Sequence, residues 1–200
     1  NGFLDQKTTC AKLNSEEPLT FGAMSIFRRW KGQHQAIEAL SFLKEVGLSA
    51  KLIFIGGPDG HDSTYYDECK ELVIAKGLQN EVEFLGFQTE PLKLMAKRFD
   101  ILLQPSTSPD PLPTTVIEGL MLGLPVIGYN AGGINEMVLD RVNGLLINSP
   151  TSEKLADAMK EIICNPKQIN IYGQASRKLY EKNFTQNKYS SDLLNQLRSI

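Results

Sequence analysis

Two carboxylate residues, Asp110 and Glu118, stand eight positions apart in the segment SPDPLPTTVIEGLMLGLPVIGYNAGGINEMV (residues 108–138). Glu118 is the only charged residue between Pro111 and Tyr129. An ionised carboxylate in such an apolar run costs free energy unless a polar group meets it, and a ligand rich in hydroxyls would be such a partner. The alternative is a surface glutamate on an amphipathic helix, with Asp110 as a turn residue.

The residues between the two acids form a candidate anion site. Pro113 suits the first position of a helix, where its missing N–H would be unpaired in any case. The N–H groups of Thr114 and Thr115 would then project from a helix start, which carries partial positive charge and readily holds phosphate. Both threonine hydroxyls could add donors. Simple N-capping explains the threonines equally well.

A second candidate group is the basic stretch RRWKGQ after the first apolar segment. Arg28, Arg29 and Lys31 would form a diphosphate clamp, because cations there can offset charge that builds on a leaving phosphate. A solvated basic turn is the alternative. Trp30 is interpreted as a packing anchor rather than as a platform for base stacking.

Composition limits the classes of function. The 200 residues, with 21 basic and 23 acidic side chains, suggest one globular domain without the basic surface of a nucleic-acid-binding protein. Three scattered cysteines, Cys10, Cys69 and Cys164, indicate a reducing compartment rather than a disulfide framework. His34 and His61 are expected at the surface and lack the spacing of a metal site, so we expect no metal and no cofactor.

No transmembrane segment is expected, because no run approaches the roughly 18 apolar residues of a membrane span. The chain opens at Asn1 rather than Met, which suggests a fragment or a processed product. Residues 1–18 are polar and read as a linker to something missing. We place a single domain at residues 19–185 and a C-terminal helix at 186–200.

Short apolar runs alternate with helix-like patterns along the chain, which predicts an α/β fold with a parallel, Rossmann-like sheet covered by helices on both faces. The expected strands are Leu19–Ser25, Lys51–Gly56, Val82–Leu85, Ile101–Gln104, Pro125–Gly128 and Gly144–Ile147. The expected helices are Gln33–Val46, Ser63–Lys76, Glu90–Arg98, Thr114–Leu122, Ile134–Leu139 and Thr151–Cys164. Beyond Pro166 the chain is expected to be helical, in two pieces around Asn183–Gln186.

Ligands of open α/β sheets bind outside the carboxyl ends of the strands. The loops expected there are rich in glycine and proline. They cover residues 25–33, 56–63, 86–90, 105–113 and 129–133. We therefore predict that the two carboxylates and the basic stretch face one ligand, although glycine is common in loops of any kind.

Six of these segments together resemble one enzyme family over roughly residues 19–190. They are RRWKGQHQAIEAL, LIFIGGP, VEFLGF, FDILLQPS, DPLPTTVIEGLMLGLPVIGYNAGGINEMV and NGLLINSPTSEKLADAMKEIICNP. Each is weak alone, but all six in order are specific. The chain resembles the C-terminal, donor-binding domain of retaining glycosyltransferases of the GT-B architecture (group 1, or family four).

The resemblance implies roles for several residues. By similarity, Glu118 would hold the ribose hydroxyls of a nucleotide, and Asp110 would contact hydroxyls of the transferred sugar. Lys31 matches a phosphate-binding lysine. Four further positions, Pro113, Thr114, Thr115 and Gly22, belong to the implied donor-binding set. Phe87 and Gln88 match a loop whose backbone meets the nucleobase.

Two positions depart from the family pattern. The first carboxylate is Asp110 where the family usually has Glu, and Ala23 stands where an arginine usually follows the glycine of the first strand. Arg28 or Arg29 would have to supply the missing charge. If neither residue affected diphosphate affinity when replaced by alanine, this idea would fail.

The resemblance implies a nucleotide sugar as co-substrate, an N-terminal acceptor-binding domain outside this chain, and a cytoplasmic location, for which the inner membrane face is one common setting. Transfer would proceed with retention at the anomeric carbon. One alternative is a non-catalytic domain that binds a nucleotide sugar or a partner on the same fold. Another is a sugar-nucleotide epimerase on the GT-B plan, for which the sequence offers no identifiable acid and base.

Overall fold

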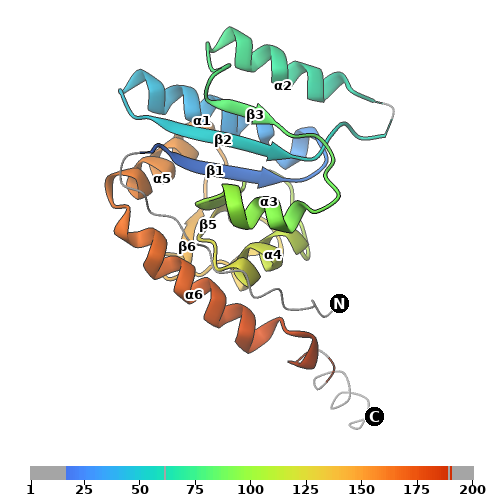
Figure 1. The fold of residues 1–200 in the computed structure, drawn as a ribbon, viewed down its shortest axis with the longest axis vertical. Helices are drawn as coiled ribbons and strands as arrows, with labels where there is room; N and C mark the ends of the chain where they lie inside the picture. The colour runs from blue at the N-terminus through green and yellow to red at the C-terminus, as the bar shows by residue number, and fades with distance from the viewer. Residues whose placement is uncertain (1–16, 61, 189, 191–200) are drawn as a thin grey trace.

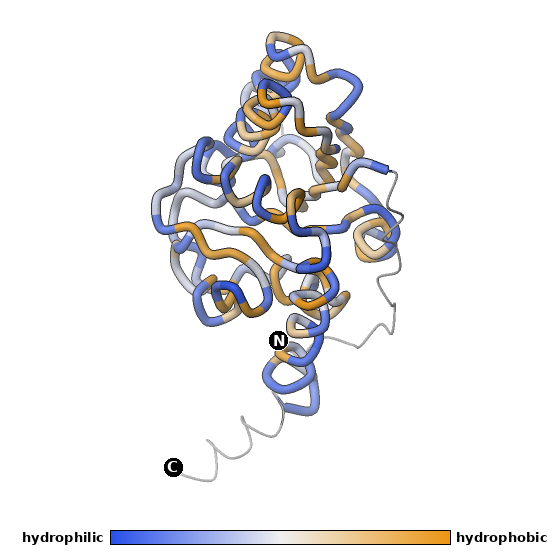
Figure 2. The backbone as a smooth tube through the Cα atoms, turned by 90° about the vertical axis from the view of Figure 1, so that its left-hand side faces the viewer, coloured by the Kyte–Doolittle hydropathy of each residue, from blue (hydrophilic) through white to orange (hydrophobic). Residues whose placement is uncertain are grey.

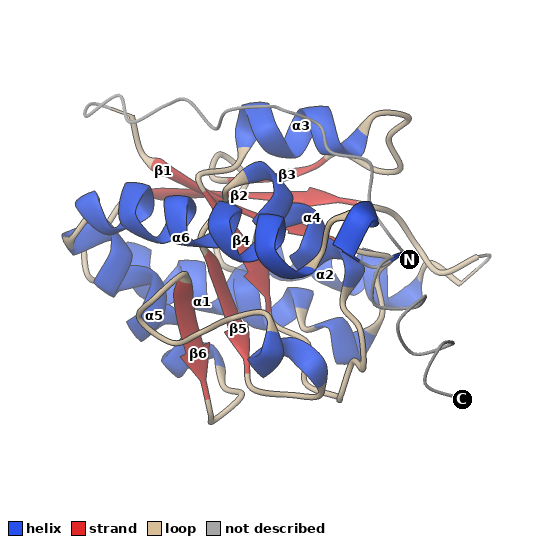
Figure 3. Cartoon of the chain, turned by 90° about the horizontal axis from the view of Figure 1, so that it is seen from below, coloured by secondary structure: helices blue, strands red, loops and turns tan. Residues whose placement is uncertain are grey.

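The computed structural model of this chain describes residues 17–60, 62–188 and 190. Its strands are all parallel and form a single sheet in the order β3-β2-β1-β4-β5-β6 (Figures 1 and 3). The strands are β1 (Leu19–Met24), β2 (Ala50–Ile55), β3 (Val82–Phe84), β4 (Ile101–Gln104), β5 (Val126–Tyr129) and β6 (Gly144–Ile147). Each of the predicted strands is present, and the Rossmann-like fold is confirmed.

Helices cover both faces of the sheet. One face packs against α1 (Gln33–Glu45), α2 (Thr64–Ala75) and α5 (Ser152–Cys164), and the other packs against α3 (Pro91–Arg98) and α4 (Thr114–Leu122). The long helix α6 (Lys167–Asn183) adds side chains to both cores and lies along α4 (Figure 1).

The apolar runs of the sequence explain why the strands are central. β4 and β5 are buried at every position, and β2 is buried everywhere except at Lys51. Burial on both faces is the environment that continuous apolar strands require. In Figure 2 apolar stretches run through the middle of the molecule, and the helices around them alternate between hydrophilic and hydrophobic residues. Among the described helices, none combines the length and the apolar character needed to cross a bilayer.

One predicted element is wrong. The segment expected as a helix at Ile134–Leu139 is a short 3₁₀ helix, η2 (Gly133–Glu136). Gly132 before it has a φ of 75°, and its backbone pairs with Asp110. The buried Asn143 side chain accepts a hydrogen bond from the Leu139 N–H at 2.7 Å, so this N–H does not pair with the helix carbonyl four residues before it.

At the C-terminus, α6 ends at Asn183, and residues 186–188 and 190 are again helical. The break predicted around Asn183–Gln186 is therefore present. The rest of the predicted C-terminal helix and residues 1–16 of the predicted linker lie outside the described residues.

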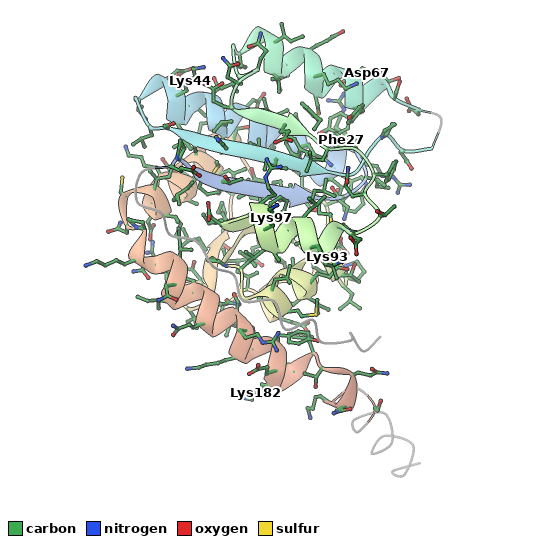
Figure 4. All side chains as sticks on the ribbon, in the orientation of Figure 1. Phe27, Lys44, Asp67, Lys93, Lys97 and Lys182 are labelled. Atoms are coloured by element: carbon green, nitrogen blue, oxygen red, sulfur yellow. The ribbon has the colours of Figure 1, made fainter. Side chains whose placement is uncertain are left out.

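The strand order places a switch point between β1 and β4. From β1 the chain builds outward to β2 and β3, whereas from β4 it builds in the opposite direction to β5 and β6. The loops after these two central strands therefore diverge, and the crevice between them is where open α/β sheets bind ligands. In Figure 4, Phe27 lies beyond the carboxyl end of β1, and Lys44, at the end of α1, lies near the opposite, amino ends of the strands.

Candidate functional site

The loop after β1 is anchored by an aromatic cluster. The buried Phe27 ring lies 5.5 Å from Phe54, 4.7 Å from Tyr66 and 5.8 Å from Phe84, measured between centroids. The Phe27 N–H also donates to the Gly57 carbonyl at 2.9 Å. This anchor fixes the start of the loop that carries Lys31.

The same loop is fastened to the loop after β4. A short 3₁₀ helix, η1 (Arg29–Lys31), presents the Trp30 carbonyl, which accepts hydrogen bonds from the Thr107 N–H at 2.7 Å and from its hydroxyl at 3.3 Å. Gly32 follows with a φ of 73°, and a Cβ atom there would lie 1.9 Å from the Pro105 carbonyl oxygen. Only glycine allows the two loops this close approach.

Lys31 and Asp110 meet between these loops. The Lys31 Nζ lies 2.9 Å from Asp110 Oδ2 and 4.1 Å from the centroid of the Trp30 ring. The side chains of Lys31 and Asp110 are only 16% and 17% exposed. The structure thus places these two residues next to each other in a direct ion pair, which the sequence did not predict.

A third loop supports Asp110 from behind. The Asp110 carbonyl accepts a hydrogen bond from the Gly133 N–H at 2.9 Å. A Cβ atom on Gly132 would lie 2.5 Å from the Asp110 carbonyl oxygen, and one on Gly133 would lie 2.3 Å from the Pro111 carbonyl oxygen. The two glycines therefore let the loop after β5 pack against the loop that carries Asp110.

The amino end of α4 directly follows the loop that carries Asp110. Pro113 is the N-cap residue, whereas its missing N–H had suggested the first helical position. No side chain caps the helix. Helix geometry leaves the N–H groups of Thr114 and Thr115 without intrahelical partners, and they carry the positive end of the helix dipole. Thr114 is exposed. The Thr115 hydroxyl instead donates to the Met24 carbonyl at 3.1 Å, so it is a structural tie and not an available ligand donor.

Glu118 lies one turn further along α4. It shares a helix face with Thr115, whose hydroxyl bonds to the end of β1, so this face is turned toward the switch point. Glu118 is half-buried, and burial raises the pKa of its carboxyl to about 6. Within the described part of the chain, Glu118 has no hydrogen bond and no ion pair. A half-buried acid without a partner is costly for the free protein, which is typical of a group kept for a ligand.

The predicted clamp of three cations does not form in this structure. Arg28 pairs with Asp59 in the loop after β2, with Nε 2.6 Å from Oδ2, and Arg29 pairs with Glu68 on α2. Both pairs are exposed, at 46% and 43% for the first and 65% and 45% for the second. The two arginines therefore lie with acids of the β2 side, whereas Lys31 turns toward the β4 side.

The contact predicted for Gly22 is not supported by its position. Gly22 is buried inside β1, and a Cβ atom there would lie 2.3 Å from the Phe99 ring. It makes room for that ring rather than facing the edge of the sheet. Ala23, where the family pattern has arginine, is also buried.

Phe87 and Gln88 lie at the carboxyl edge but further out. They follow β3, and the strands β2 and β1 separate β3 from β4. The Phe87 side chain is 68% exposed and lies beside Gly57, while the Gln88 side chain donates to the Leu85 carbonyl. A contact between their backbone and a nucleobase stays a prediction.

Sequence reasoning missed one supporting residue and misplaced another. Gln33 is 1% exposed. Its Nε2 donates hydrogen bonds to the Ser25 hydroxyl at 2.9 Å and to the Ile26 carbonyl at 3.0 Å, and these bonds stabilise the loop after β1. A glutamine directly after a glycine at a helix start was the available signal. His34, expected at the surface, is half-buried with Nδ1 2.8 Å from the Tyr65 hydroxyl, and burial lowers its pKa. His61 lies outside the described residues.

Comparison with known proteins decides the family. The family model described as "Glycosyl transferases group 1" matches residues 5–179. The chain belongs to the group 1 glycosyl transferases.

Within the described residues, no group of three or more His, Cys, Asp and Glu side chains is arranged to hold a metal ion.

The curated relatives that this chain matches are longer than the chain. D-inositol 3-phosphate glycosyltransferase of Rhodococcus erythropolis is 28% identical over 165 residues, which is 82% of this chain and 36% of that protein. Alpha-1,3/1,6-mannosyltransferase ALG2 of Dictyostelium discoideum is 32% identical over 186 residues, which is 84% of this chain and 44% of that protein. The chain thus spans less than half the length of these relatives.

Solved structures similar to this chain include HepE of Anabaena in complex with UDP. It matches with a TM-score of 0.84 and 27% identity, over 92% of this chain and 49% of that one. HepE in complex with UDP-glucose matches with a TM-score of 0.83. The C-terminal domain of LpcC from Francisella tularensis shares the fold alone, with a TM-score of 0.73 at 23% identity, and this chain covers 90% of it.

Proposed function

We propose that this chain binds a nucleoside diphosphate sugar and forms the donor half of an enzyme that transfers the sugar to an acceptor with retention of anomeric configuration. One observation supports the proposal. Lys31 forms an ion pair with Asp110 in the loop that leads into the uncapped amino end of α4, and the unpartnered Glu118 lies one turn further along that helix. A cation, uncapped backbone N–H groups and a free carboxylate are the groups that a diphosphate and a polyol require.

The diphosphate would lie between Lys31 and the N–H groups of Thr114 and Thr115. As the bond from the anomeric carbon to the β-phosphate oxygen breaks, negative charge builds on the leaving diphosphate. An ammonium group and a helix terminus stabilise that charge more in the transition state than in the ground state, which accelerates the reaction. We propose that these groups make a metal ion and any other cofactor unnecessary.

The two carboxylates would hold the parts of the donor that carry hydroxyls. Glu118, deeper along α4, would accept hydrogen bonds from the ribose, which supplies the partner it lacks in the free protein. Asp110, at the mouth of α4, would accept hydrogen bonds from the transferred sugar. Phe87 and Gln88 would meet the nucleobase through their backbone.

The acceptor would be held by a further domain outside this chain, since the chain covers 49% of the HepE structures that it matches. That domain would present the acceptor hydroxyl on the face of the sugar that the diphosphate leaves, which gives retention. The domain would also exclude water. We therefore expect this chain alone to bind the donor and to transfer sugar weakly or not at all.

Calorimetric titration of the chain with UDP, GDP and ADP, and with UDP-glucose, GDP-mannose and ADP-glucose, tests the proposal. UDP comes first because the HepE structures hold UDP and UDP-glucose. We expect saturable binding of one nucleotide and at least tenfold weaker binding by Glu118→Ala and by Lys31→Ala, which is the scale of one hydrogen bond to a charged group. Equal binding by all three proteins would overturn the site.

A second candidate function is a non-catalytic domain that binds a nucleotide sugar. The engagement of Arg28 and Arg29 with Asp59 and Glu68 favours it, because the diphosphate then meets one cation instead of three. Sugar transfer by the full-length protein, assayed on the nucleotide sugar that binds, separates the two. Binding without transfer or hydrolysis would favour the second candidate.

A further inference from the structure

The ion pair between Lys31 and Asp110 occupies the place where the proposed diphosphate must bind. The Lys31 Nζ is 2.9 Å from the Asp110 carboxylate, and both side chains are largely buried. The Trp30 ring covers the ammonium group from another side, at 4.1 Å. In the free protein, the cation proposed to bind phosphate is therefore already neutralised.

A diphosphate cannot use Lys31 without disturbing Asp110. Its negative oxygens and the carboxylate would compete for one ammonium group, and two anions within a few ångströms repel each other strongly at a partly buried site. Asp110 cannot move far, because its backbone pairs with Gly132 and its carbonyl is bonded to the Gly133 N–H. Binding of a bare diphosphate thus leaves a displaced carboxylate close by with no partner.

An intact nucleotide sugar removes this penalty. The sugar is joined covalently to the β-phosphate, so it is the part of the donor that lies next to a diphosphate held by Lys31. Its hydroxyls donate hydrogen bonds, and a carboxylate that loses an ammonium partner regains free energy from such donors. The cost of breaking the pair is therefore offset for the donor but not for the nucleoside diphosphate.

We propose that the Lys31–Asp110 pair makes the site discriminate the intact nucleotide sugar from the nucleoside diphosphate that remains after transfer. This inference rests on the proposed function. When the sugar leaves, Asp110 loses its hydroxyl partners and competes again for Lys31, which weakens the hold on the product. Asp110 is thus a positioning residue toward Lys31 as well as a contact for the sugar.

The variant Asp110→Asn tests the pair directly. It removes the competing charge and keeps the size of the side chain, so affinity for UDP should rise about tenfold, the effect expected when one partly screened charge is removed. Affinity for UDP-glucose should rise less or fall, because the lost carboxylate was its sugar contact. The ratio of the two dissociation constants should therefore shift about tenfold toward UDP. If GDP or ADP binds more tightly, that nucleotide and its glucose or mannose conjugate replace UDP.

Asp59→Asn is the matched control. It removes the same charge from the same edge of the sheet and frees Arg28 instead of Lys31. If it shifts the ratio as much as Asp110→Asn does, the effect is one of net charge and the proposal is wrong. An unchanged ratio in Asp110→Asn would also overturn it.

Fluorescence provides a second readout that needs no variant. Trp30 is the only tryptophan of the sequence, and the Lys31 ammonium lies over its ring. Saturating UDP-glucose should change the emission of the unmodified chain, because Lys31 turns from Asp110 to the diphosphate. Constant emission at saturation would overturn the proposal even if Asp110→Asn failed to fold. Failure of the unmodified chain to bind any of the nucleotides would overturn the proposed function itself, whereas binding with an unchanged ratio overturns only this inference.

Discussion

Three ion pairs at the carboxyl edge of the sheet differ in burial. The outer pairs, Arg28–Asp59 and Arg29–Glu68, are exposed, whereas the inner pair, Lys31–Asp110, is largely buried. Arg28 and Arg29 pair with acids on the β2 side, and all four side chains are 43% exposed or more. Lys31 pairs with Asp110 on the β4 side, where both side chains are less than one-fifth exposed. Residues of the same charge within four positions of each other thus have different surroundings. Their tertiary partners, not their sequence neighbours, decide which cation can act on a ligand.

The largest expected effect concerns the backbone that holds the inner pair. Gly32→Ala should lower the free energy of unfolding by about 3 kcal/mol or more, because it adds both a strained positive φ and a clash with the Pro105 carbonyl oxygen. Gly47→Ala is the matched control, since Gly47 has a φ of 77° and nothing within 4 Å. It should cost only about 1 kcal/mol. Urea unfolding measures both, and equal losses would show that the contact between the loops is unimportant.

The next effect concerns the inner cation itself. Lys31→Met keeps the aliphatic stem against Trp30 and removes the charge, so nucleoside diphosphate sugar should bind about 30- to 100-fold more weakly, the scale of a lost charge-assisted hydrogen bond. Calorimetry on the chain measures the change. A loss of less than threefold would place the diphosphate elsewhere.

Glu118 should show opposite effects on stability and on binding. Its pKa of about 6 lies above its ordinary value of 4.5, so the folded protein holds the proton more tightly than the unfolded chain does. The stability that this proton contributes is fully present below the ordinary value and is lost as pH rises through about 6. Glu118→Gln should therefore raise the free energy of unfolding at pH 8 by about 1 kcal/mol, after allowance for partial exposure, and should weaken donor binding about tenfold.

Unfolding of both proteins between pH 5 and pH 8 checks this sign. The gap in stability between Glu118→Gln and the unmodified chain should widen as pH rises through about 6. Donor affinity of the unmodified chain should fall below this pH, because a protonated carboxyl accepts hydrogen bonds poorly. If this difference in stability stays constant with pH, the pKa of Glu118 is not raised in the folded protein.

The outer pairs should give the smallest effect. Arg28→Ala and Arg29→Ala should each change UDP affinity less than about threefold and stability by less than about 1 kcal/mol, as is usual for exposed ion pairs. Titration at low and moderate salt measures this. A tenfold loss in either variant would mean that the arginine leaves its acid and reaches the diphosphate, which would restore the predicted clamp.

The sequence predicted the strands correctly because buried strands follow from local patterns, and the same patterns gave the candidate site its predicted place. Buried strands appear as short apolar runs, and strands of a parallel sheet place their following loops at one edge, so Lys31, Asp110 and Glu118 could be brought together in advance. The partners of the side chains could not be predicted. Arg28 bonds to a residue 31 positions away and Lys31 to one 79 positions away, and nothing local distinguishes them.

Other errors have the same origin. Gly22 was expected to contact the ligand but makes room for the Phe99 ring. The Thr115 hydroxyl was expected to be a ligand donor but donates its hydrogen bond to the Met24 carbonyl. The helix expected at Ile134–Leu139 was wrong: the chain enters this segment paired with Asp110 at Gly132, and only Gly133–Glu136 is helical. Each case depends on a contact between distant segments, which periodicity does not encode.

The carboxyl end of α4 is held by contacts with α6, whereas no side chain caps its amino end. A Cβ atom on Gly173 of α6 would lie 2.5 Å from the Gly123 carbonyl oxygen, and Arg177 Nη1 donates to the Met121 carbonyl at 2.6 Å. With its rear terminus clamped by α6, α4 has little freedom to slide along its own axis. Any adaptation of the proposed donor site must therefore come from the surrounding loops, so exchanging those loops between relatives is a direct route to changed selectivity on an unchanged scaffold.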